Sequence, residues 1–135
     1  MKKIIDNIFG EMEYVHSWTK KDSFTFFGKK YNVNITAQAY QNDEILESQK
    51  ENYQKYQNFI TQHESTIKKK LLEYCHTICN NNNIVLEQCL QPKTIIFERD
   101  GSWGILFESN CDIEHGVALF MIDDDIKTGP QDIFL

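Results

Sequence analysis

Two carboxylates and an imidazole fall within four residues, at Asp112, Glu114 and His115. Such groups can bind a metal ion or move protons, so this segment is the first candidate for chemistry. However, a catalytic zinc site takes three protein ligands, which so short a loop holds with poor geometry, and a calcium loop needs more oxygen ligands. The competing interpretation is an acidic turn whose side chains accept hydrogen bonds from backbone amides. We expect no metal, no cofactor and no catalytic residue.

The four cysteines form a second candidate for metal binding. Cys75 and Cys79 are spaced to share one face of a helix and could chelate, while Cys89 and Cys111 lie elsewhere. The first pair also continues an apolar stripe with Leu71, and the chain has no C-x-x-C pair. A chain of 135 residues with four cysteines is not typical of a disulfide scaffold. We therefore predict reduced, mostly buried thiols.

Other motifs with a known chemistry are missing from the sequence. It has no glycine-rich phosphate loop, no G-x-S-x-G and no H-E-x-x-H, so the case for an enzyme is weak. Lys68 to Lys70 are too few for a nucleic-acid patch in a chain of net charge −6. Asp6 interrupts the first apolar run, and no stretch approaches the roughly 20 apolar residues of a membrane span. We expect a cytoplasmic protein that binds neither nucleic acid nor membrane.

The candidate loop is positioned by predicted strands. Arg99 to Ser102 reads as a tight turn in which Gly101 takes a positive φ, and Asp123 to Asp125 as another turn. The strands expected around them are Thr94–Glu98, Trp103–Glu108, Gly116–Ile122 and, at an edge, 126–135. The segment from Ile84 to Leu90 fits either a strand or a short helix, ended by Pro92.

Three further strands are expected in the first 40 residues. They are Phe9–Trp18, Ser23–Phe27 and Tyr31–Tyr40, rich in aromatic and β-branched side chains. In the last of these, polar residues such as Asn32 and Asn34 alternate with apolar ones, which predicts a sheet with one wet face. Trp18 precedes a polar turn, so we expect it to be partly exposed.

Between the two groups of strands, apolar residues recur every three or four positions. This pattern predicts a helix from Asn42 or Asp43 to about Cys79, ended by Asn80 to Asn83. A straight helix of that length would measure about 55 Å, whereas a compact domain of this size is only ~35–40 Å across. We expect a bend or a two-helix hairpin at the weak helix formers of Thr61–Thr66.

These elements predict a single domain, residues 1–135, of the α+β class. Its one mostly antiparallel sheet has three N-terminal strands and three or four C-terminal strands, packed against a long or bent central helix.

The negative charge is concentrated in the last third of the chain. Residues 1–40 carry six lysines against four acids (+2), and residues 41–92 carry five against seven (−2). Residues 93–135 carry three cations against nine acids, so this third alone holds a charge of −6. Such a field repels phosphates and attracts cationic partners, although it also serves ordinary solubility.

Several runs resemble a family of small bacterial domains of unknown function. They are Phe-x-Arg-Asp-Gly-Ser-Trp-Gly-Ile-Leu-Phe-Glu, Cys-Asp-x-Glu-His-Gly-Val-Ala, Gly-Pro-Gln-Asp-Ile, Phe-Gly-x-Met-x-Tyr and Glu-x-Gln-Lys-Glu-x-Tyr-x-Lys-Tyr. Such domains are similar to the immunity proteins encoded beside polymorphic or contact-dependent toxins. The resemblance implies an inhibitor of a neighbouring toxin, and it supplies no catalytic residues.

Charge and resemblance together favour a non-enzymatic immunity protein that neutralises a cationic, nuclease-like toxin, acting as a monomer or weak homodimer. The expected contact residues are Asp112, Glu114, His115, Asp123, Asp124, Asp125, Glu108 and Trp18. Two alternatives remain open. One is a small metal- or ligand-binding domain, possibly hydrolytic, centred on Asp112, Glu114 and His115. The other is an assembly module that dimerises through a sheet edge or the helix.

Overall fold

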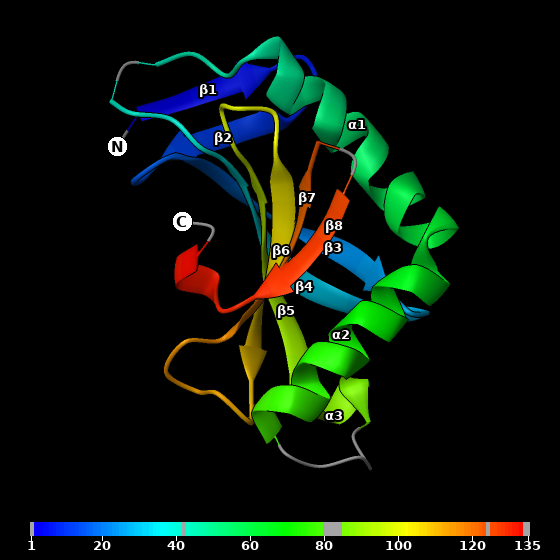
Figure 1. The fold of residues 1–135 in the computed structure, drawn as a ribbon. Coiled ribbons are helices and arrows are strands. Elements are labelled where there is room, and N and C mark those ends of the chain that lie inside the picture. Colours follow the sequence, from blue (N-terminus) through cyan, green and yellow to red (C-terminus); the bar gives the residue numbers. More distant parts are fainter. Residues whose placement is uncertain (1, 42, 80–84, 124, 134–135) are drawn as a thin grey trace.

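The computed structural model describes residues 2–41, 43–79, 85–123 and 125–133. Within them, one sheet of eight strands runs in chain order from β1 to β8 (Figure 1). Its strands are β1 Lys2–Asp6, β2 Gly10–Tyr14, β3 Trp18–Phe26, β4 Lys29–Ala37, β5 Leu90–Phe97, β6 Trp103–Ser109, β7 Val117–Ile122 and β8 Asp125–Gly129. The helices are α1 Glu47–Gln62, α2 Glu64–Cys79, α3 Leu86–Cys89 and the 3₁₀ turn η1 Gln131–Ile133.

Neighbouring strands are antiparallel everywhere except between β4 and β5, which are parallel. Antiparallel neighbours can be joined by tight turns, but a parallel pair needs a long crossover connection. The β4–β5 connection holds α1, α2 and α3. Figure 1 shows α1 and α2 following one another along one face of the sheet, with η1 on the opposite side.

The predicted fold is wrong in two respects: the number of N-terminal strands and the single central helix. Four strands, not three, precede the helices, and four follow them in the same sheet. β1 is short and charged, so its pairing with β2 was not visible in the pattern. The segment Phe9–Trp18, predicted as one strand, is divided by a turn between β2 and β3. β5 begins at Leu90 because the register shift between Pro92 and Thr94 accommodates a proline inside the strand.

The helical region is two helices that meet at His63, inside the stretch where the sequence predicts a break. Each has 16 residues and is therefore about 24 Å long, short enough for a domain of this size. The predicted start at Asn42 or Asp43 is wrong, since α1 begins at Glu47. Asp43 instead accepts a hydrogen bond from the Tyr40 amide at 3.0 Å. Asn42 and the predicted stop at Asn80–Asn83 lie outside the described residues.

Gln49 fixes the first turn of α1 to the sheet. Its side chain is fully buried, and Nε2 donates to the backbone carbonyls of Gln38 at 2.8 Å and Phe97 at 2.9 Å. These carbonyls directly follow β4 and end β5. Oε1 accepts from the amide of Leu46 at 2.8 Å, which caps the helix. A single side chain thus joins the carboxyl ends of the two parallel strands to the helix N-terminus.

The main core lies between the helices and the sheet. It is built largely of aromatic rings, and Phe97 packs edge-on against Phe9, Tyr53 and Tyr56. On the other face, Asn32 and Asn34 are exposed, which confirms the predicted wet face there. Farther along that face, a second small cluster is formed by Ile96, Ala118 and Phe120. No helix among the described residues is long and apolar enough to cross a membrane.

Candidate functional site

The β6–β7 loop is held by an internal contact between two of its predicted site residues. Asp112 Oδ1 accepts a hydrogen bond from the backbone amide of His115 at 3.1 Å and lies 3.0 Å from His115 Nδ1. The amide of Gly116 donates to the Asp112 carbonyl at 2.8 Å. The side chain of Glu114 is exposed. The loop is therefore an acidic turn capped by its own carboxylate, which is the competing interpretation that the sequence offered for this segment.

The contact with Asp112 raises the pKa of His115, first through the hydrogen bond and then through the negative charge, because both favour the imidazolium. Since the folded-state pKa is raised, the contact stabilises the fold below pH ~6.5 and this contribution is lost as pH rises through the folded-state value. We expect an NMR titration to place the pKa of His115 above its ordinary value and Asp112→Asn to lower it. Asp132→Asn should lower it less, because Asp132 contributes the weakest of the interactions. An equal effect of both changes would contradict this origin.

Two of the four cysteines are paired with each other. Cys79 and Cys111 are joined in a disulfide with their Cα atoms 5.2 Å apart, so the predicted reduced state is wrong for these two. Their positions, 32 residues apart on α2 and the β6–β7 loop, gave no local signal of pairing. Cys75 is a buried free thiol as predicted, and burial raises its pKa to about 11. Across the described ranges, no three His, Cys, Asp or Glu side chains are placed to hold a metal ion.

The predicted contact residues fall into two groups at opposite ends of β7. Glu108 lies near the β6–β7 loop and its carboxylate is 4.0 Å from the Lys93 ammonium. Asp123 and Asp125 flank the β7–β8 turn at the other end, and Asp124 lies outside the described residues. The six residues of β7 separate the groups by about 20 Å. The predicted contact acids that the structure describes therefore lie in two separate groups.

Trp18 belongs to neither group. The sequence predicted partial exposure, which is wrong: the side chain is 3% exposed. Its indole N–H donates to the carbonyl of Asp43 at 3.0 Å, and its ring meets Tyr14 edge-on. The polar residues after Trp18 misled the prediction, because they continue β3 and form no turn, and the segment before α1 covers the ring.

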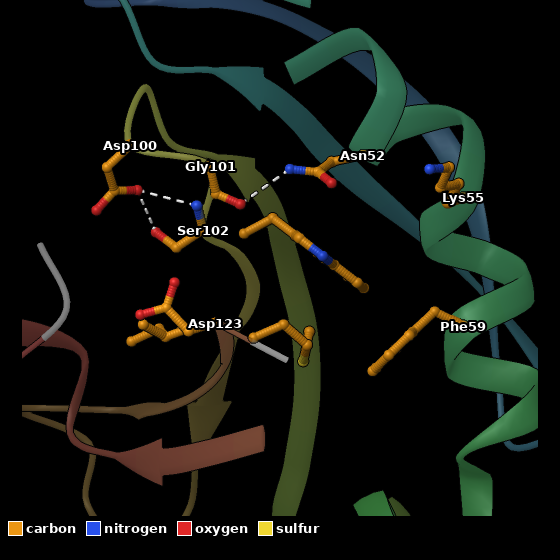
Figure 2. A pocket seen from close by; sticks show the side chains of 10 residues that line it. Asn52, Lys55, Phe59, Asp100, Gly101, Ser102 and Asp123 are labelled. Carbon is orange, nitrogen blue, oxygen red and sulfur yellow. Dashed lines mark hydrogen bonds between the residues drawn. The ribbon is translucent and has the colours of Figure 1, made fainter. Parts of the chain in front are cut away.

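A hollow of about 690 Å³ lies at the end of the sheet that carries Asp123 (Figure 2). It is bounded by the β5–β6 turn, the β7–β8 turn and α1. Its lining residues are Asn52, Lys55, Phe59, Asp100, Gly101, Ser102, Trp103, Met121, Ile122 and Asp123. The pairing of Trp103 with Met121 brings the two turns side by side. We call this end of the sheet the hairpin end and this cavity the hollow.

The acidic wall of the hollow is organised by Asp100 and Ser102. Asp100 Oδ1 accepts hydrogen bonds from Ser102 Oγ at 2.6 Å and from the Ser102 amide at 2.9 Å. These bonds lower the pKa of Asp100, so its carboxylate is ionised at neutral pH. Across the hollow, Asn52 Nδ2 donates to the Gly101 carbonyl at 3.0 Å and holds α1 against the turn (Figure 2).

The floor of the hollow is apolar. Trp103 and Met121 are 6% and 5% exposed, and the ring of Phe59 meets Trp103 edge-on with centroids 5.6 Å apart. The sequence predicted the tight turn and the strand that begins at Trp103 but not the hollow. Its residues come from three separate segments, and only the strand register and the docking of α1 bring them together.

A comparison with known families finds one family whose match covers both ends of the sheet. A family described as a domain of unknown function (DUF6985) matches residues 8–135. The chain belongs to this family. Its DUF6985 region includes the β6–β7 loop and the hollow, while β1 precedes it. Comparisons with curated proteins and with solved structures give no match.

Proposed function

We propose that this DUF6985 domain is a non-enzymatic immunity protein that binds and neutralises a cationic, nuclease-like toxin, and that it does so through the hairpin end. The observation that carries the proposal is a set of exposed carboxylates at that end. Asp100, Asp123 and Asp125 are all exposed, and within the described ranges none of them forms an ion pair. Their charges are therefore available to a partner.

The opposite end is less suited to this role. Asp112 is engaged by His115 and Glu108 lies beside Lys93, which leaves Glu114 as the predicted contact acid there that forms no ion pair among the described residues. The disulfide at Cys111 also fixes that loop to α2. Charges already engaged within a protein offer less to a partner than free ones, because the internal contact must be given up on binding.

Inhibition in this account needs no chemistry by the DUF6985 domain. A nuclease cleft is lined by cations that bind phosphates, so a rigid acidic surface can occupy it in place of the substrate. Complementary charge also speeds association, which favours capture of the toxin before it acts. The two turns of the hairpin end provide such a surface on a rigid sheet.

The proposal is tested in cells that express the protein encoded by the adjacent gene. We expect wild-type domain to protect growth and Asp123→Asn/Asp125→Asn to lose protection. Asparagine is chosen because Asp123 has a positive φ, which Asn tolerates. The matched control, Glu108→Gln/Glu114→Gln, removes the same charge from the opposite end and should still protect. Loss of protection only in the control pair would reject the hairpin end, and no protection by wild type would reject the function.

A further inference from the structure

We infer that the hollow is the anchoring subsite for an arginine side chain of the partner, with the guanidinium against Asp100 and Asp123. The inference rests on the proposed function for the identity of the protein that carries the arginine. Beyond the proposed function, the inference names the chemical group of the partner that is recognised and the place on this domain where it binds. Two features support it, the pair of carboxylates and the apolar floor, and the position of Lys55 provides a test.

The carboxylate of Asp100 is fixed with one oxygen free. Both hydrogen bonds from Ser102 go to Oδ1, and no described group donates to Oδ2. Figure 2 shows Asp100 and Asp123 on the side of the hollow opposite Asn52, Lys55 and Phe59 of α1. Because Ser102 is 8% exposed and donates to Asp100 through both its amide and its hydroxyl, Asp100 keeps this orientation without a ligand. A preorganised acceptor loses little entropy on binding.

The combination of acids above an apolar floor fits arginine better than other cations. Its methylene stem can contact Phe59 and Trp103 while the planar guanidinium reaches the carboxylates. A guanidinium presents several donors in one plane and can bridge two carboxylates, whereas an ammonium acts as a point charge. The hollow is open to solvent, so it can accept a side chain that extends from a protein surface.

Among the described residues that line the hollow, Lys55 is the one cation, on the α1 side. It is exposed, and among the described residues it makes no ion pair. Its charge repels an incoming guanidinium, so replacing it with an acid should increase affinity. This variant separates recognition from folding, because a damaged protein does not bind more tightly.

The test is an NMR titration of ¹⁵N-labelled domain with the capped tripeptide acetyl-Gly-Arg-Gly-amide. We expect saturable shifts at the Ser102 amide, the Trp103 indole and the Asn52 side chain. Asp100→Asn/Asp123→Asn should weaken binding roughly tenfold and Lys55→Glu should strengthen it roughly fivefold, since an exposed charge makes a modest contribution to an ion pair. Glu108→Gln/Glu114→Gln is the matched control and should leave binding unchanged.

A peptide with citrulline in place of arginine keeps the shape without the charge and should not bind. Equal binding of the citrulline peptide, shifts confined to other surfaces, or weaker binding by Lys55→Glu would overturn the inference. The outcomes also separate the two proposals. If the arginine peptide binds the hollow but the adjacent gene's product forms no complex, the immunity function fails and the subsite stands. If the complex forms and the hollow variants bind it like wild type, the subsite fails alone.

Discussion

Gln49→Met is expected to lower the free energy of unfolding by about 3 kcal/mol, the cost of leaving buried polar backbone groups without partners. Methionine keeps the length and shape of the side chain but cannot donate to the carbonyls of Gln38 and Phe97 or accept from the amide of Leu46. Because Gln49 is fully buried, water does not replace these bonds. Urea denaturation measures the change, and the dependence on urea concentration should stay that of wild type.

The matched control is Gln54→Met, the same substitution at an exposed position of α1, which should change stability by less than about 0.5 kcal/mol. Similar small effects for both variants would show that Gln49 does not hold the helix to the sheet. Loss of the Gln49 hydrogen bonds should also affect the candidate site. Asn52 and Lys55 follow Gln49 within the next two turns of α1, so loosening the helix start should also widen the hollow.

Cys111→Ser is expected to lower stability by about 3.5 kcal/mol under oxidising conditions, because the disulfide to Cys79 closes a chain segment of 32 residues and restricts the unfolded state. Thermal or urea unfolding with and without dithiothreitol measures this. Wild type with reductant should unfold like the variant, and the variant should not respond to reductant.

Cys89→Ser is the matched control, since Cys89 is a free, partly buried thiol, and it should leave the response to reductant intact. A wild-type protein whose stability is the same in both conditions would contradict the pairing. The disulfide also bears on the predicted cytoplasmic location, because disulfides persist mainly in oxidising compartments. That location stays a prediction, and the redox state of Cys79 and Cys111 in cells would test it.

Much of the strand pattern was predictable because it depends on neighbours along the chain. Burial alternates along β4 as Val33, Ile35 and Ala37 turn inward, and the residues around Gly101 form a turn regardless of the rest. The break at His63 was predictable too, since helix length must fit the size of the domain. β1 was not, because its few apolar residues become recognisable as a strand only through pairing with β2.

The candidate site also has one part that could be predicted from the sequence and one part that could not. The contact between Asp112 and His115 spans three residues, so the sequence could suggest a capped turn there. The hollow depends on the register of β6 against β7 and on the docking of α1, and no short pattern encodes either. Asp100 and Asn52 were therefore missed, although Asp-Gly-Ser in a tight turn signals that Asp100 could be oriented by Ser102.

The most direct test of toxin binding through the hairpin end is isothermal titration calorimetry of the purified domain with the product of the adjacent gene. We predict a one-to-one complex whose affinity falls as salt increases. Asp123→Asn/Asp125→Asn should weaken it roughly tenfold or more, and Glu108→Gln/Glu114→Gln should bind like wild type. Absence of binding, or an equal loss of affinity in both pairs of variants, would contradict recognition through the hairpin end.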